Sequence, residues 1–389
     1  MRVAITAARL DPNHGGAGAW TIAFARWLHA RGHDVHLAGF KVGRDVGLPP
    51  ERVQCLDGQG THLTAAQALS AWLAPRHFDV VHDMGVGCEF DLFHSHFGSL
   101  RAMESAKQRS RPRLQRLVRR LSAPMCGRKR SVARLATQQF SNPRAIYVAV
   151  SKMVAEDLVR FEGVDRARIR CVPNGVDTQR LCPERRLALR QSARRRFAIG
   201  GDELAVSVIA HNFWLKGVPH LIETVRSLQT FPAKLHVVVV GGHRQRPQRL
   251  AVGRHMLSYT GALDSTEEVL AATDAYLHPT IYDACSLSVL EAMAYGLPTL
   301  TTRNNGAAER IVHGHNGLII RDAFDREGLE ACLRLLVEPT FREALGVRAR
   351  AASLAWTQED SYLAIERLYA ERSAASSSEP RYRNVLAAA

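Results

Sequence analysis

The sharpest pattern of apolar and polar positions along the chain predicts a strand, a loop, a helix and a second strand in close succession. The apolar run Ala275–His278 leads into a proline-containing loop, as the end of a buried parallel strand does. Apolar side chains then recur at helical spacing up to about Tyr295, with Ser286 as a suitable N-cap. Gly296 stands where helices often end, and the strand Thr299–Thr302 follows at once.

The same alternation of short apolar runs with helical patterns extends along most of the chain. Further strands are expected at 3–7, 35–40, 78–82, 90–93, 145–150, 204–210 and 235–240, and further helices at 19–31, 152–161, 185–196, 267–272 and 356–372. Strands that alternate with helices in this way predict an α/β fold with parallel sheets. The length of 389 residues is enough for two such domains, each with its own core.

Two carboxylates bracket the helix that begins at Ser286. Asp283 lies in the loop before this helix, and Glu291 lies inside it. The first amides of a helix have no partner within the helix, and its dipole favours an anion such as a diphosphate. A carboxylate on either side of that anion could accept hydrogen bonds from the neutral hydroxyls of a sugar and a ribose. The pair alone also fits a simpler arrangement, in which Asp283 caps the helix and Glu291 faces water.

The residues from Glu291 to Pro298, EAMAYGLP, are more specific than the spacing of the two acids. Together with Asp283 they resemble the signature of the retaining nucleotide-sugar glycosyltransferases of family 4, written E-x7-E and followed by a helix that ends in E-A-x-A-x-G-L-P. The first acid departs from this pattern, because Asp283 is one methylene shorter than Glu. The surrounding letters, YDACS-x-x-VLEA, are similar to a subgroup near the lipopolysaccharide-core glycosyltransferases.

The resemblance implies a binding site for a nucleoside diphosphate sugar, expected to be a UDP- or GDP-hexose, with no metal and no other cofactor. Glu291 is expected to bind the ribose, and Asp283 the transferred sugar. Lys216, which follows a predicted strand and precedes a helix, is expected to neutralise the diphosphate. The family usually has an Arg a few residues earlier, where this chain has His211 or Asn212. The start of the helix is expected to contact the donor through Cys285, Ser286, Leu287 and Ser288.

Two features of the first half of the chain are also candidates for the site. Gly15 and Gly16 follow the first predicted strand and would let backbone amides approach a phosphate or sugar closely, although a tight turn needs the same residues. The family has a GG loop near the donor diphosphate and acceptor, and a His that hydrogen-bonds the transferred sugar. His96 is at about this place, with His94 as the alternative, and a surface His without a role is the simpler interpretation. No third ligand is nearby in the sequence, so a zinc site is not expected.

The resemblance covers about residues 1–370 and implies the GT-B arrangement, in which two Rossmann-like doubly wound domains face each other. An N-terminal acceptor-binding domain is expected at 1–172 and a C-terminal nucleotide-sugar-binding domain at 173–355. In this arrangement a last helix, here 356–372, commonly crosses back to the first domain. The tail at 373–389 is low in hydrophobicity and is expected to be disordered.

The net charge of +15 is concentrated in one segment. Residues 101–134 contain twelve Lys and Arg and a single acid, Glu104. Within the segment, Leu114, Leu117, Val118 and Leu121 follow helical spacing, and the basic face carries Arg113, Arg116, Arg119 and Arg120. Such a helix is typical of anionic membrane surfaces, where each Lys or Arg contributes roughly 1 kcal/mol. A helix packed on the core with solvated arginines would show the same pattern. Nucleic-acid binding is not expected, because no aromatic residues are interleaved and no recognition module is found.

Other features of the sequence concern the cellular compartment. No run of 18 apolar residues is present, and the first residues show a strand pattern without a signal peptide. The seven Cys are scattered and include no C-x-x-C pair, which favours reduced thiols over disulfides or a zinc site. We therefore expect a cytoplasmic protein, peripheral on the inner leaflet of the plasma membrane.

These features predict a hexosyltransferase that acts with retention of configuration on a lipid-linked or lipopolysaccharide-type saccharide acceptor. Metal independence is expected, because no Asp-X-Asp pair is present. Three alternatives stay open. A GT-B nucleotide-sugar epimerase or hydrolase would need acid and base groups that the sequence does not reveal. A glucan synthase would leave the basic helix unexplained, and a non-catalytic basic membrane-binding or nucleic-acid-binding protein would leave the signature unexplained.

Overall fold

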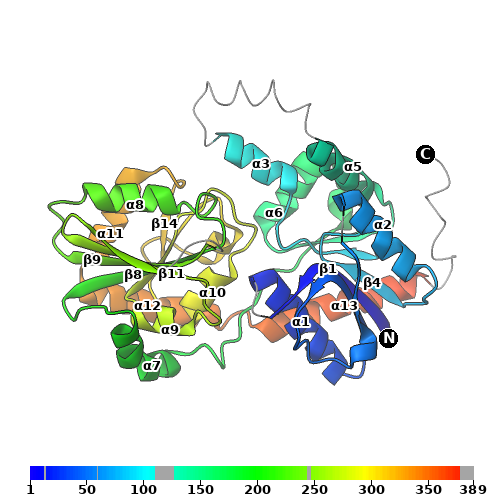
Figure 1. Ribbon diagram of the computed structural model, residues 1–389, viewed down its shortest axis with the longest axis horizontal. Helices are drawn as coiled ribbons and strands as arrows, with labels where there is room; N and C mark the ends of the chain where they lie inside the picture. The colour runs from blue at the N-terminus through cyan, green and yellow to red at the C-terminus, as the bar shows by residue number, and fades with distance from the viewer. Residues whose placement is uncertain (13–14, 59, 110–126, 243–246, 377–389) are drawn as a thin grey trace.

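The computed structural model describes residues 1–12, 15–58, 60–109, 127–242 and 247–376. These residues form two α/β halves, each built on one seven-stranded sheet (Figure 1). The expected pair of doubly wound α/β units is therefore confirmed. The first sheet ends at Cys171 and the second begins at Glu203.

The first sheet is parallel throughout, with strand order β3-β2-β1-β4-β5-β6-β7. Its strands are β1 (Arg2–Leu10), β2 (Asp34–Val42), β3 (Val53–Cys55), β4 (Val80–Asp83), β5 (Leu92–Phe93), β6 (Ile146–Ala149) and β7 (Ile169–Cys171). The helices of this half are α1 (Gly16–Ala30), α2 (His62–Leu73), α3 (Leu100–Arg109), α5 (Gly127–Ser141) and α6 (Lys152–Asp157). The central strands are apolar and buried, as expected for a parallel sheet with both faces covered.

The second sheet has the order β10-β11-β9-β8-β12-β13-β14, and only β10 is antiparallel to its neighbour among the described strands. Its strands are β8 (Glu203–Ala210), β9 (Lys234–Gly241), β10 (Gln248–Val252), β11 (His255–Gly261), β12 (Ala275–His278), β13 (Thr299–Thr302) and β14 (Leu318–Ile320). The helices of this half are α7 (Pro183–Arg196), α8 (Val218–Ser227), α9 (Glu267–Ala272), α10 (Leu287–Ala294), α11 (Arg326–Leu335) and α12 (Pro339–Ser353). The sequence did not reveal β10, because all but its last residue are exposed.

Helix α1 begins earlier than its hydrophobic pattern predicts. The prediction places its start near Ala19, whereas the helix begins at Gly16. Gly15 precedes the helix with φ +86°, a conformation that glycine adopts without strain. The second glycine therefore forms part of the first helical turn and does not belong to a separate loop.

The last helix, α13 (Gln358–Ser376), packs on the first half of the molecule (Figure 1). The hydroxyl of Tyr369 lies 2.7 Å from Nδ1 of the buried His82, a residue of β4. Arg372 donates to Asp91, directly before β5, over 3.0 Å. The chain thus returns to its first half after it completes the second sheet.

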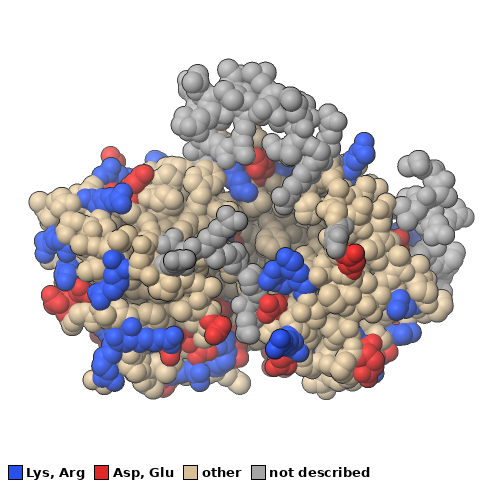
Figure 2. Space-filling model, viewed as in Figure 1, with Lys and Arg blue, Asp and Glu red and all other residues tan. Residues whose placement is uncertain are grey.

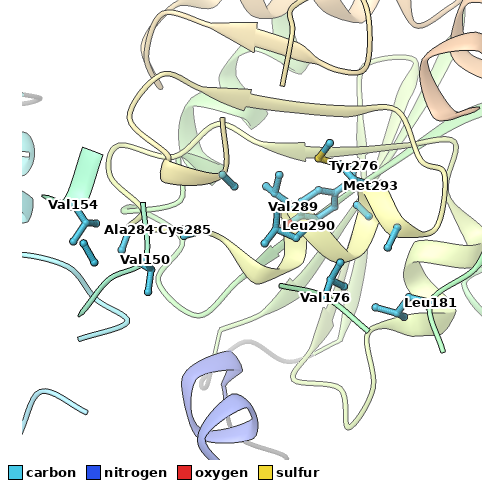
Figure 3. Packing of buried hydrophobic residues seen from close by; sticks show 14 of the residues in the cluster. Val150, Val154, Val176, Leu181, Tyr276, Ala284, Cys285, Val289, Leu290 and Met293 are labelled. Atoms are coloured by element: carbon cyan, nitrogen blue, oxygen red, sulfur yellow. The ribbon is translucent and has the colours of Figure 1, made fainter. Parts of the chain in front are cut away.

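The two halves also share one apolar cluster. Val150 and Val154, at the end of β6 and in α6, belong to the same cluster as Ala284 and Cys285 of the loop before α10 (Figure 3). All four side chains are at most 6% exposed. This contact fixes the loop before α10 against the first half of the molecule.

The predicted basic amphipathic helix lies mostly outside the described residues. Arg113, Arg116, Arg119 and Arg120 all belong to the range 110–126, so only the flanking helices α3 and α5 are described. Helix α7 is also rich in arginine. Its Arg185 forms an ion pair with Glu267 and its Arg190 with Asp274, and Figure 2 shows blue and red side chains close together in this region. None of the helices in the described ranges is long and apolar enough to cross a membrane.

Candidate active site

The loop between β12 and α10 places Asp283 beside two groups. Its Oδ2 atom forms an ion pair with Lys216 Nζ, and it accepts a hydrogen bond of 2.8 Å from His278 Nε2. Lys216 precedes α8, and His278 is the last residue of β12. The structure therefore brings together two of the predicted site residues, Lys216 and Asp283, and adds His278, which the sequence did not single out.

A chain of side-chain hydrogen bonds continues from His278 to the start of α10. The Tyr276 hydroxyl lies 3.0 Å from His278 Nδ1 and 2.7 Å from Ser288 Oγ. Ser288 Oγ in turn lies 2.9 Å from Ser286 Oγ. This network links the lysine ammonium to the two serines of the helix terminus, so the polar groups of this side are held in fixed positions.

Two opposing effects act on the Asp283 carboxyl. Burial disfavours its charged form, but the positive charge of Lys216 and the hydrogen bond from His278 outweigh burial and lower its pKa. Burial also lowers the pKa of His278, although the hydrogen bond to Asp283 opposes this. At neutral pH the network therefore contains an ammonium, a carboxylate and a neutral imidazole whose proton is on Nε2.

The prediction that the Ser286 amide is free for a ligand is wrong. This amide donates to Asn305 Oδ1 over 3.1 Å, across the loop that follows β13. Asn305 is held in turn by a hydrogen bond of 3.0 Å to Thr301. Sequence reasoning missed the contact because Asn305 lies 19 residues further along the chain. Among the described residues, the next two amides, of Leu287 and Ser288, have no acceptor, as is usual for the first turn of a helix.

Glu291 lies inside α10, partly buried, and no hydrogen bond reaches its carboxylate within the described part of the chain. Burial raises its pKa, and the positive charge of Arg180 offsets this only in part. A partly buried carboxylate without a protein donor is able to accept two hydroxyl groups from a ligand. Its role in binding ribose stays a prediction.

The start of α1 faces the start of α10 across the two halves. A methyl group added at Gly16 would lie 3.0 Å from Leu287 Cδ1, and one added at Gly15 would lie 3.4 Å from His211 Nε2. The predicted residues Gly15, Gly16 and Leu287 therefore meet at one place. A Cβ at Gly16 would require the Leu287 side chain to move by a few tenths of an ångström, so the backbone of α1 lies close to the start of α10.

His94 and His96 lie with His82 in a group of stacked aromatic rings at the end of the first sheet. The ring centroid of His94 lies 5.3 Å from that of His82 and 4.5 Å from that of His96. Burial lowers the pKa of His96 to about 3, and that of His94 is lowered as well. His94 is 1% exposed, whereas His96 is only partly buried, so His96 stays the candidate for contact with a sugar. In the described ranges, no group of three or more His, Cys, Asp or Glu could hold a metal ion.

Cys285 and its neighbours have a structural role that the sequence did not indicate. Asn174 donates to the Cys285 carbonyl over 3.3 Å, and Ser151 donates to the Ala284 carbonyl over 2.8 Å. The Glu309 carboxylate accepts hydrogen bonds from the first two amides of α6, at 3.0 and 2.8 Å. The loop before α10 is thus joined to the first half and to the connecting segment by polar contacts as well as by apolar packing.

Two protein-family models match the chain. The model described as Glycosyltransferase Family 4 matches residues 14–180, and the model described as Glycosyl transferases group 1 matches residues 204–338. The two stretches together span more than half of the chain. They contain all the predicted site residues, including Gly15, Lys216 and Glu291.

Two curated proteins illustrate the sequence similarity. The lipopolysaccharide glucosyltransferase WaaG of Escherichia coli is 28% identical over 222 residues, which cover 55% of this chain and 59% of WaaG. The D-inositol 3-phosphate glycosyltransferase of Geodermatophilus obscurus is 26% identical over 408 aligned positions, which cover 93% of this chain and 87% of that protein. The chain thus spans less than two thirds of the first relative and most of the second.

Solved structures extend the similarity to the fold. The crystal structure of WaaG, described as a glycosyltransferase involved in lipopolysaccharide biosynthesis, has a TM-score of 0.76 at 21% identity and covers 94% of this chain and 99% of that one. Anabaena HepE in complex with UDP and glucose has a TM-score of 0.71 at 16% identity, covering 95% and 99%. At these identities the structural likeness shows the two-domain GT-B fold. With both family models and the E-x7-E-like signature at α10, the chain belongs to the family 4 glycosyltransferases of the GT-B fold.

Proposed function

We propose that this protein is a retaining glycosyltransferase that moves a hexose from a nucleoside diphosphate sugar to a lipid-linked or lipopolysaccharide-type saccharide. One observation carries the proposal. Along the chain, the free amides of Leu287 and Ser288 at the start of α10 lie between Asp283, which pairs with Lys216, and Glu291, and the Leu287 side chain lies against Gly16 of α1. This arrangement offers one anion site with a carboxylate on each side, which matches a diphosphate between a sugar and a ribose.

Each group would have a distinct role in binding the donor. The two free amides and the Lys216 ammonium would hold the diphosphate, and Glu291 would accept the ribose hydroxyls. Asp283 uses Oδ2 for both of its protein contacts, so Oδ1 is the oxygen that would accept a hydroxyl of the sugar. WaaG is named a glucosyltransferase and HepE was solved with UDP and glucose, which supports UDP-glucose as the first donor to test.

The chemistry of the transfer would rest on charge stabilisation. As the bond to the sugar breaks, negative charge grows on the leaving diphosphate, where helix amides and an ammonium are already oriented. The family resemblance implies attack by the acceptor on the same face of the sugar, with the leaving phosphate assisting removal of its proton. His96 would hydrogen-bond the sugar as a neutral imidazole, because burial keeps its pKa at about 3. Covalent attack by Asp283 is not needed in this scheme.

A position on an anionic membrane surface is the second part of the proposal. Next to the basic segment 101–134, Phe97 is 61% exposed and Leu100 is 44% exposed. Exposed apolar side chains beside a run of cations are suited to the boundary between lipid headgroups and acyl chains. A protein bound there would reach an acceptor that is carried on a lipid of the inner leaflet.

The activity is tested by incubating the purified protein with a panel of nucleotide sugars, with and without a lipid-linked acceptor. Release of nucleoside diphosphate is followed, and the anomeric configuration of the product is read by NMR. The proposal expects acceptor-dependent release from one donor, with retention, at a rate that EDTA leaves unchanged. Acceptor-independent release would favour a hydrolase or epimerase, and transfer only to a soluble glucan would favour a glucan synthase.

The membrane part is tested separately by sedimentation with anionic vesicles at two salt concentrations. Binding should fall with salt, because the Debye length shortens from about 10 Å at 0.1 M to about 3 Å at 1 M. Replacing Arg113, Arg116, Arg119 and Arg120 by Gln should reduce vesicle binding and spare transfer to a short, soluble acceptor. A helix packed on the core predicts the opposite, namely unchanged vesicle binding and a loss of stability when Leu117 is made polar.

A further inference from the structure

A cavity lies in the first half of the molecule, apart from the candidate donor site at the start of α10. Its volume is about 730 Å³, within the roughly 300–1,000 Å³ that is usual for small-molecule sites. The ends of β1 and β2, the loop before α2, the loop after β4 and one face of α5 line it. It therefore opens at the carboxyl ends of parallel strands, where open α/β sheets bind their ligands.

The ionisable side chains that line this cavity are all of basic residues. Arg9 and Lys41 contribute at the ends of β1 and β2, His62 contributes at the start of α2, and no carboxylate is among the described lining residues. Lys41 has no carboxylate partner within the described residues, and Arg9 has only Asp11, whose Oδ2 lies 3.9 Å from Arg9 Nη1. No described carboxylate therefore pairs with Lys41, and Arg9 has only a long ion pair.

The walls add the other features of a saccharide site. Phe40, Val86 and Leu135 provide apolar surface. On the α5 side, Ser131 Oγ is buried and has no hydrogen-bond partner among the described residues. Burying a hydroxyl without a hydrogen-bond partner costs free energy unless a ligand or a water molecule forms a hydrogen bond with it. Apolar walls with a few oriented polar groups are the usual composition of a small-molecule pocket.

One wall of the cavity is held rigidly. The buried Asp83 carboxylate accepts hydrogen bonds of 2.8, 2.8 and 2.7 Å from the amides of Gly85, Val86 and Gly87, and one of 2.5 Å from Thr6. Gly85 and Val86 line the cavity, so the loop after β4 is fixed before any ligand binds. Asp83 is thus a positioning residue for this wall.

The cavity also adjoins the donor side of the molecule. Gly85 lines the cavity, and a methyl group added there would lie 3.3 Å from Oγ of Ser95, the residue before His96. A saccharide held in the cavity would therefore have one end near the place where the donor sugar is proposed to lie. We propose that this cavity binds the acceptor through an oxyanion, a phosphate or carboxylate on the saccharide, with Lys41 and Arg9 as its counter-ions. The identification of the bound saccharide as the acceptor rests on the proposed function. The binding of an anionic sugar, however, can be measured without turnover.

Calorimetric titration of the protein with mannose 6-phosphate, glucuronate and neutral mannose tests the inference. At least one anionic sugar should bind more tightly than mannose, and Lys41→Gln should weaken that binding about fivefold to tenfold, as loss of a charged hydrogen bond does. Arg9→Gln should weaken it in the same direction. Arg195→Gln removes the same charge from an exposed position on α7 and should change nothing. Preference for mannose 6-phosphate or glucuronate identifies phosphate or carboxylate as the recognised group.

Two results would overturn the inference. One is equal binding of neutral and anionic sugars, and the other is an equal effect of Lys41→Gln and Arg195→Gln. Lys216→Ala separates this cavity from the donor site, because it should leave the binding of mannose 6-phosphate unchanged. A protein that binds the anionic sugar but releases no nucleoside diphosphate from any donor would contradict the proposed transferase activity and leave the anion site intact.

Discussion

The two sides of the interface between the halves differ in how their polar groups are paired. On the α10 side, Lys216, Asp283 and His278 form one network of ion pair and hydrogen bond that continues to Ser286. On the α1 side, both ring nitrogens of His94 and one nitrogen each of His82, His96 and Trp20 are buried without a partner among the described residues. Apart from Glu291 and the first two amides of α10, the polar groups named on the α10 side are paired within the protein, whereas these nitrogens on the α1 side are not.

This difference indicates that the two sides have different roles in the proposed reaction. A network that is already paired holds its charges in place before a ligand arrives, which is what stabilisation of a leaving diphosphate requires. Buried nitrogens without partners carry a desolvation cost that a bound hydroxyl group would remove. We therefore expect substitutions on the α10 side to act on charge and turnover, and substitutions on the α1 side to act on sugar contacts and on pH dependence.

The largest effect is expected from Asp283→Ala. Removal of one partner leaves the Lys216 ammonium unpaired in a partly buried position, so the free energy of unfolding should fall by roughly 3 kcal/mol. Turnover should fall by roughly 100-fold or more, because the network no longer orients its groups. Chemical denaturation and steady-state kinetics measure the two effects, and Asp264→Ala, at an exposed position, is the control. If nucleotide affinity falls as much as turnover does, Asp283 does not lie at the sugar end.

A smaller effect is expected from Lys216→Ala, and it should depend on the ligand. The lysine neutralises a diphosphate, so the variant should lose roughly 1–3 kcal/mol of affinity for a nucleoside diphosphate and much less for the monophosphate. Calorimetric titration with both nucleotides measures the difference. Arg195→Ala serves as the control for loss of one positive charge. Equal losses for the two nucleotides would remove Lys216 from the phosphate site.

The smallest effect concerns pH and the α1 side. The pKa of His96 is about 3 in the folded protein because the ring is buried, and its ordinary value is 6.5. The unfolded chain therefore binds more protons between these values, and stability falls as the pH drops below 6.5. Each such group contributes at most about 1.4 kcal/mol per pH unit. In urea titrations at pH 7, 6 and 5, His96→Gln should show a shallower fall than the wild type, and His315→Gln, an exposed control, should not. Identical slopes would mean that His96 is not buried as a neutral ring.

The sequence predicted the elements whose signals are local. The strands β12 and β13 and the helix α9 were predicted with their observed bounds, and prolines mark the end of β12 and the start of β13. The start of α1 was predicted too late in the sequence. Glycines are typical of loops, but they also occur at helix starts where another group approaches the backbone closely. Strand β10 was missed because an exposed edge strand needs no apolar alternation.

The candidate site could be predicted only where its residues match sequence patterns of the family. Glu291, Asp283 and Lys216 were identified, but the roles of His278 and Tyr276 depend on side chains that meet across a strand and a helix. The Ser286 amide was misjudged for the same reason, because its acceptor, Asn305, lies in another loop. Contacts between elements distant in sequence are set by the packing of the sheet, and one sequence contains no direct sign of them.

The proposed donor site at α10 is tested by comparing the wild type with Glu291→Ala, using the donor found in the nucleotide-sugar panel. Glu291 has no protein donor within the described residues, so its removal should leave the fold unchanged and affect only the ligand. The variant should keep the unfolding midpoint of the wild type while donor affinity and transfer fall by roughly 1–3 kcal/mol. Donor binding and turnover equal to those of the wild type would show that the donor ribose does not bind at α10.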